Sequence, residues 1–165
     1  MRPSDTRFSS SRANRSTNRP FKALHDRIPY GSMFIEFMVV ETTGVAQVVH
    51  KPKWPAIQSA IQGLDGIVKT MICLMKTNEC RMDIGGGAHD RCVVSGTVDN
   101  EAYHMLIEAM RGKEPVKITV NGQINDYPAE VLVAKVSVLK AAKLFAEKGQ
   151  WEPSVQWRST VDAQG

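Results

Sequence analysis

The order of apolar and polar residues from Met33 onward predicts short strands between two amphipathic helices. The first strand is predicted at residues 33–40 and is followed by a loop that reaches Lys53. A helix is expected to begin at Trp54-Pro55, because proline in the first helical turn loses no backbone hydrogen bond. An apolar stripe at helical spacing follows, and glycines end the helix. The stripe is Ile57, Ala60, Ile61 and Leu64, and the glycines are Gly63 and Gly66.

The middle of the chain predicts a run of strands joined by polar turns. The expected strands are residues 67–76, 80–84 and 91–98. Residues 101–110 fit a helix or a strand. Residues 115–120 and 129–136 predict a hairpin, because Asn121-Gly122 and Asn125-Asp126 between them are typical turn pairs.

A second helix is predicted from Ser137, whose side chain can cap it, to Gly149, which ends it. One side of this helix carries Leu139, Ala142, Phe145 and Ala146. The order helix, strands, helix is typical of an α+β fold, an antiparallel sheet with an N-terminal and a C-terminal helix packed on one face. Residues 33–165 form a single predicted domain, long enough to bury roughly two thirds of its unfolded surface.

The first 32 residues differ in composition from the rest of the chain. They are rich in Ser, Arg, Asn and Pro and hold seven basic and two acidic residues, a net charge of +5. Such a segment buries too little apolar area to offset the entropy of ordering, so residues 1–32 are expected to be a disordered basic tail. The tail is interpreted as an interaction arm, a transit sequence, or a leader read from a start codon placed too early, with Met33 as the true initiator.

The predicted domain itself is almost neutral. Residues 33–165 hold 14 basic and 15 acidic residues, a net charge of −1. Nucleic-acid-binding domains draw much of their affinity from basic groups, so nucleic-acid binding is not expected of this part and would depend on the tail. No apolar stretch approaches the ~20 residues of a membrane-spanning helix, and no secretory signal is recognised. A cytoplasmic location without membrane contact is expected.

Candidate catalytic and metal-binding residues are few, and no cofactor or metal is expected. Gly85-Gly86-Gly87 lacks the Lys-Thr and the helix start of a phosphate loop, so it is interpreted as a hairpin connection. A zinc site lacks the close cysteine pair of structural sites, and buried reduced thiols are favoured over it. The candidate ligands are Cys73, Cys80, His89 and Cys92. A small enzyme that uses Cys92 or His104 is the open alternative.

Two tryptophans follow the second helix. Trp157 is interpreted as an anchor of a C-terminal segment that folds back on the core. Trp151 either packs in the same way or belongs to a binding surface, because partly exposed aromatic residues often carry interface energy.

A series of short motifs runs through residues 54–157. Each motif is weak alone, but their order and spacing together are fairly specific. The residues that carry them, with expected structural roles, are Trp54, Gly85, Gly86, Gly87, Gly122, Pro128, Phe145, Gly149 and Trp157. The series resembles a family of bacterial immunity proteins that are often encoded beside deaminase-type polymorphic toxins. The chain departs from that pattern at Cys92, where an aromatic residue is usual, at Trp151, where an aliphatic one is usual, and at Arg158, where an acidic one is usual.

The resemblance implies a non-enzymatic inhibitor. Such a protein binds the catalytic domain of a cognate toxin, here expected to be a nucleic-acid-targeting deaminase or nuclease, and occludes its active site. A basic groove on the toxin would be complemented by acidic side chains at predicted turns, for which ordinary solvated turns are the alternative interpretation. The candidate toxin-binding residues are Asp83, Asp90, Asp99, Glu101, Asp126, Tyr127 and Trp151. The oligomeric state is left open.

Overall fold

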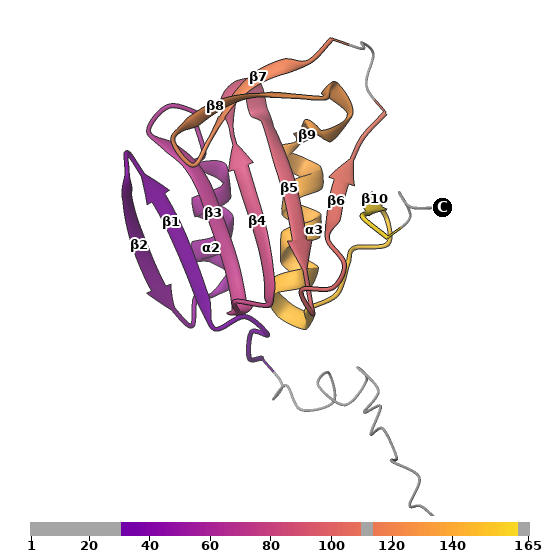
Figure 1. Cartoon of the computed structure of the whole chain (residues 1–165). Coiled ribbons are helices and arrows are strands. Elements are labelled where there is room, and N and C mark those ends of the chain that lie inside the picture. The colour runs from indigo at the N-terminus through magenta and orange to yellow at the C-terminus, as the bar shows by residue number, and fades with distance from the viewer. Residues whose placement is uncertain (1–30, 110–113, 162–165) are drawn as a thin grey trace, which may run out of the picture.

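A long antiparallel sheet forms the middle of the fold in this computed structural model, which describes residues 31–109 and 114–161. Neighbouring strands all pair antiparallel (Figure 1). From one edge to the other the strands are β10 (Gln156–Ser159), β6 (His104–Ile107), β5 (Arg91–Thr97), β4 (Cys80–Gly86), β3 (Lys69–Thr77), β1 (Phe37–Thr42) and β2 (Val45–His50). β9 (Val133–Ala134) pairs with the start of β5. The α+β prediction is confirmed.

Two helices, α2 (Trp54–Gln62) and α3 (Lys135–Lys148), lie on the same side of this sheet (Figure 1). Pro55 stands in the first turn of α2, as predicted. Gly149 ends α3 in the left-handed conformation, with φ of 64°. Within the described residues, neither helix has the length and apolarity that crossing a bilayer would require.

The predicted cap of the second helix, Ser137, is wrong by three residues, because Ala134 occupies the N-cap position. α3 begins at Lys135, so Ser137 lies inside its first turn, and the Ser137 hydroxyl donates a hydrogen bond to the Glu108 carboxylate instead of capping the helix. The physical reason is that β9 pairs with β5 up to Ala134, and the chain turns into the helix directly from that strand. The same Glu108 carboxylate accepts the Ala134 N–H at 3.2 Å, which fixes this turn.

The predicted hairpin around Asn121-Gly122 exists with a different second strand. β7 (Val116–Val120) pairs with β8 (Gln123–Tyr127), and a two-residue Asn-Gly turn joins them. Residues 129–136, the predicted partner, form a short 3-10 turn, β9 and the start of α3. The strand β8 was missed because it is polar and exposed along most of its length, so it lacks the alternation that marks a half-buried strand.

Two exposed strands at the edges of the main sheet were also missed. β2 replaces the loop expected before Lys53, and it follows β1 through a tight turn in which Thr43 and Gly44 have φ of 46° and 81°. β10 forms within the C-terminal segment that was expected to fold back on the core, for which no strand was predicted. The ambiguous residues 101–110 contain β6, and residue 110 lies outside the described part.

The main core lies between the sheet and the two helices. Its fully buried side chains come from alternate positions of the inner strands and from the inward faces of α2 and α3. The largest are Phe145, Ile35, Ile57, Ile61, Leu64, Ile72, Leu74, Met82, Ile84 and Leu106. Trp54 packs at the margin of this core, with the Lys143 ammonium 5.8 Å from its ring centre. The predicted core helices are therefore held by the burial of their apolar stripes.

The glycine run is a hairpin connection with close backbone contacts, as predicted. Gly85 is buried in β4, where a Cβ atom would lie 2.4 Å from a Val120 methyl group of β7. Gly87 has φ of 113°, and a Cβ there would lie 2.4 Å from the Leu64 carbonyl carbon. These contacts exclude larger side chains. The run joins β4 to β5 and packs the β7–β8 hairpin against the sheet.

Candidate functional site

The sheet side opposite the helices is only partly covered. β7 and β8 cross one end of it, and the rest faces outward (Figure 1). We call the uncovered part the open face. Its side chains are all partly exposed: Phe37, Val39, Cys73, Met75, Arg81, Asp83, Ser95 and Met105.

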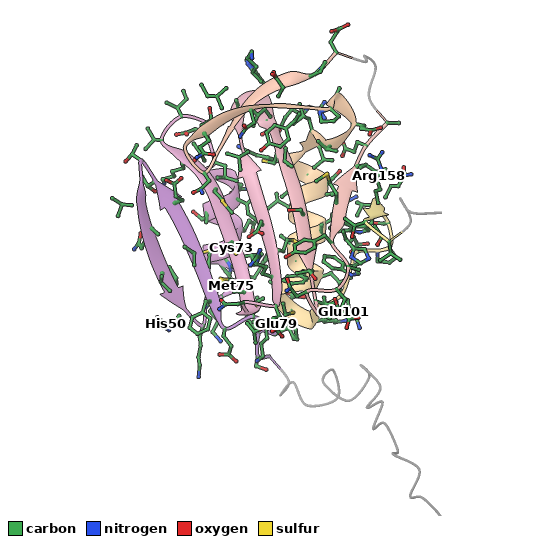
Figure 2. All side chains as sticks on the ribbon, viewed as in Figure 1. His50, Cys73, Met75, Glu79, Glu101 and Arg158 are labelled. Carbon is green, nitrogen blue, oxygen red and sulfur yellow. The ribbon has the colours of Figure 1, made fainter. Side chains whose placement is uncertain are left out.

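Strand register places these side chains in two rows across the sheet. Directly opposed residues of antiparallel strands point to the same face. One row consists of Val48, Val39, Cys73, Asp83, Ser95, Met105 and Arg158, and it crosses all seven strands from β2 to β10. The second row consists of His50, Phe37, Met75 and Arg81, and it ends at Thr97, which is fully buried. Figure 2 shows Cys73 and Met75 in the middle of the sheet, between His50 at one side and Arg158 at the other.

Strand β3 carries apolar side chains on both of its faces. Ile72 and Leu74 are fully buried against the helices, whereas Cys73 and Met75 point to the open face. A strand that faces only water on one side normally alternates apolar with polar residues. The uninterrupted apolar run in β3 was therefore the feature of the sequence that indicated a second apolar face of the sheet. This run was interpreted from the sequence as a strand, and Cys73 and Met75 were not selected as candidate toxin-binding residues.

The charges of the open face are paired with one another. Arg81 Nε lies 3.2 Å from Asp83 Oδ2, and Arg81 Nη1 donates to the Asn78 carbonyl at 3.2 Å. On the helix side of the same strands, Lys76 Nζ lies 2.8 Å from Glu36 Oε1 and 5.8 Å from the centre of the Phe34 ring. The hydrogen bond and the positive charge of Lys76 lower the pKa of Glu36. The open face is therefore apolar with an internally neutralised ion pair at its centre.

Two of the predicted acidic residues lie at one end of the sheet. Asp99 and Glu101 stand in the turn between β5 and β6, and Glu79 stands in the turn between β3 and β4. All three are exposed, and Figure 2 shows Glu79 and Glu101 at the same end. Asp99 Oδ1 also accepts the Glu101 N–H at 2.9 Å, so this carboxylate holds its own turn. We call these three residues the acidic end.

The remaining acidic candidates do not join this group. Asp83 lies on the open face. Asp90 stands in the short turn before β5, with Oδ1 3.6 Å from Lys135 Nζ. Asp126 lies on β8, with Oδ1 3.3 Å from Lys117 Nζ. The structure thus divides the predicted acidic residues among four places.

Tyr127 packs against a second small apolar cluster beneath the β7–β8 hairpin. Its buried members are Val93, Ile118, Val131 and Leu132. Val131 donates its N–H to the Pro128 carbonyl at 3.1 Å, and Gly122 donates its N–H to Thr70 Oγ1 at 3.0 Å. The Gly122 bond ties the tip of the hairpin to β3, and the Pro128 carbonyl closes the short 3-10 turn that follows β8.

Trp151 packs on the helix side of the sheet, away from the open face. Its ring stacks at 4.7 Å from His104 and 5.6 Å from Phe145, measured between ring centres, and the Trp157 ring lies at 4.9 Å. Trp157 Nε1 donates to the Glu152 carbonyl at 3.1 Å, which satisfies the partly buried indole. Both tryptophans join the margin of the main core. For Trp151, this position agrees with the packing alternative.

The three thiols have raised pKa values. Burial is the main cause for each: it raises the pKa of Cys80 to about 11 and that of Cys92 to about 12. Burial, followed by the negative charge of Asp83, raises the pKa of Cys73 still further. A raised pKa keeps the thiol protonated near pH 7, and the protonated form is a poor nucleophile. Across residues 31–109 and 114–161, no three His, Cys, Asp or Glu side chains come together as a metal site.

We expect the native thiols to react on the order of 100-fold more slowly with an aromatic disulfide reagent at pH 7 than the same thiols in guanidinium, because few are ionised in the folded state. Absorbance of the released thiolate measures the rates. A Cys92→Ser variant assigns the fraction that belongs to this residue. One thiol that reacts rapidly in the folded protein would contradict the expectation and favour the cysteine-dependent enzyme.

Two comparisons of the sequence, with family models and with curated proteins, find no match. No family model matches the chain, and no curated protein matches it significantly. The resemblance to immunity proteins therefore rests on the motif series alone. The predicted basic tail lies outside the described residues except for positions 31 and 32, so the arm hypothesis has no structural account.

Proposed function

We propose that this chain is an immunity protein, which binds the catalytic domain of a cognate toxin and blocks its active site without catalysing a reaction. The observation that carries the proposal is the open face. Cys73 and Met75 are partly exposed there beside Val39 and Phe37, and the partly exposed Met105 stands farther along the same face on β6. Apolar side chains gathered on one face are a mark of binding surfaces, and methionine is enriched at the buried centre of interfaces.

The arrangement of layers supports this role. Both helices cover one side of the sheet, so the other side remains available along most of its length (Figure 1). Methionine side chains are flexible and polarizable and adapt to the shape of a partner. The Arg81–Asp83 pair leaves no unpaired charge at the centre of the open face that would have to be desolvated on binding.

The acidic end supports a toxin that acts on nucleic acid. Glu79, Asp99 and Glu101 are exposed beside the open face. A toxin that binds nucleic acid presents basic groups around its active site, and these are attracted by carboxylates at the margin of an interface. Such marginal charges mainly accelerate association, whereas the apolar centre slows dissociation. The complex would form in the cytoplasm, where such a toxin meets its substrate.

Growth rescue combined with complex isolation tests the proposal. The toxin domain encoded beside this chain would be expressed in a bacterial host with the full chain or with an empty vector. We expect growth only with the full chain, and a one-to-one complex with a dissociation constant of about 1 nM or lower, since a lethal enzyme must remain inhibited at low concentration. A harmless neighbour, or a toxic one that does not bind, would overturn the proposal.

A further inference from the structure

We propose that β2 pairs with β2 of a second copy of this chain, so that the protein forms a two-fold symmetric dimer through the edge of its main sheet. β2 is the last strand of the sheet, and within the described residues it pairs only with β1. Its second edge therefore has backbone N–H and C=O groups without partners in the sheet. Such an edge is a template for the addition of another strand. The inference does not depend on the proposed function.

The strand lacks the features that normally protect an edge. Its sequence, Val45-Ala46-Gln47-Val48-Val49-His50, contains no Lys, Arg, Asp, Glu, Pro or Gly. Val45 is 67% exposed and Val48 is 51% exposed. The register with β1 is regular over all six pairs, without a bulge. Natural edge strands are usually short, charged, bulged or covered.

The strand at the opposite edge of the sheet, β10, is shorter than β2 and carries a charged side chain. β10 has four residues, and one of them is Arg158, whose Nη2 lies 2.7 Å from Glu130 Oε1. A short strand with a charged side chain held beside its edge disfavours further pairing. The contrast indicates that β2 is the edge open to a partner strand.

The hydrogen-bond pattern shows which groups β2 offers. In an antiparallel ladder, alternate residues bond to opposite neighbours. Lys51 donates its N–H to the Glu36 carbonyl at 2.7 Å, so the odd-numbered positions face β1. Ala46, Val48 and His50 consequently direct their N–H and C=O groups away from the sheet. These three residues can pair with another strand without loss of any bond to β1.

The free hydrogen-bonding groups of β2 are complementary to those of β2 in a second copy of the chain. If Val48 lies on the two-fold axis, it pairs with Val48 of the other copy, and Ala46 pairs with His50 of the other copy. Each residue of β2 whose backbone N–H and C=O groups point away from β1 then pairs with a residue of the other copy whose groups also do so. The pairs join two β-branched side chains, or the smallest side chain of the strand with the largest, and no like charges are opposed. The row that crosses the open face ends at Val48, so the two open faces would be continuous.

The association should be modest in strength. A six-residue strand contributes less contact area than an interface of standard size, about 1,600 Å² in total, so we expect a dissociation constant in the micromolar range. Analytical ultracentrifugation of the full chain between about 1 and 200 µM should show a concentration-dependent dimer. A monomer over this whole range would overturn the proposal.

Two matched variants test the surface. Val48→Lys places two ammonium groups opposite each other at the axis and should weaken the dimer by about 100-fold or more, because directly opposed like charges repel. The fold should persist, since Val48 is half exposed and its backbone does not bond to β1. Ile124→Lys, on β8, adds the same charge at a side chain that is 69% exposed and should leave the dimer intact. Equal association of Val48→Lys and the unaltered chain would contradict the proposal.

Cross-linking tests the register. Under mild oxidation, Val48→Cys should form a disulfide-linked dimer, because paired Cα atoms in this geometry lie about 5.5 Å apart, within disulfide range. Ala46→Cys should not, because its partner is His50, whereas an Ala46→Cys/His50→Cys double variant should. Amide exchange gives an independent readout. A monomer with a protected Val48 amide would show that another part of the chain covers the edge, and would overturn the assignment to a second copy.

Discussion

A Phe145→Ala variant should lose about 4 kcal/mol of unfolding free energy, the largest stability effect that we expect from a single substitution in this protein. The Phe145 side chain is fully buried in the last turn of α3. Its ring lies 6.2 Å from that of Phe34 and 5.6 Å from that of Trp151, measured between centres. Removal of the ring leaves a cavity among helix, sheet and C-terminal segment that these neighbours cannot close fully.

Denaturant unfolding, followed by far-UV circular dichroism, measures this loss. Val136→Ala is the matched control, because Val136 lies in the same helix but is 62% exposed, and its truncation should change stability by less than about 0.5 kcal/mol. Similar losses for both variants would contradict the assignment of Phe145 to the main core.

A Met75→Lys variant should bind the cognate toxin at least ~100-fold more weakly, a loss of about 2.7 kcal/mol, and should fail to rescue growth at low expression. Met75 lies on the open face between Phe37 and Arg81. Lysine keeps the long aliphatic stem, so the fold should tolerate it. Its ammonium group, however, would be removed from water in the complex without a partner, and it would repel a basic groove.

Calorimetry of the purified pair gives the affinities, and the rescue assay gives the biological effect. Val136→Lys adds the same charge on the helix side of the sheet and should bind the toxin normally. If Met75→Lys retains full affinity and Val136→Lys loses it, the toxin binds the helix side. The proposed role of the open face would then be wrong, although the immunity function could still hold through the rescue result.

Several elements follow from local sequence alone, and the structure confirms them. Pro55 marks the first turn of α2, and Gly149 ends α3, because each backbone position has a conformation that few residues suit. The glycine run was correctly interpreted as a connection. Local signals failed for β2 and β8, whose side chains are mostly exposed on both faces, so that no burial pattern distinguishes them from loops.

The candidate site was likewise predicted only in part. Asp83 was selected for its charge, and it does lie on the open face, but Cys73 and Met75 beside it were read only as part of a strand. Trp151, for which core packing and a binding surface were both left open, stacks on His104 and Phe145 at the margin of the main core. A side chain's chemical type is visible in the sequence, whereas its neighbours depend on strands that are far apart along the chain.

The sequence by itself determined the α+β class, the two helices, the inner strands and the neutrality of the domain, because periodicity, capping and charge are properties of neighbouring residues. Only the tertiary structure decided which strands stand at the edges, where the β7–β8 hairpin lies, and which side chains form the open face. These features depend on the order and register of strands. Register is set by long-range packing against the helices, and a shift of one residue would move every side chain to the other face.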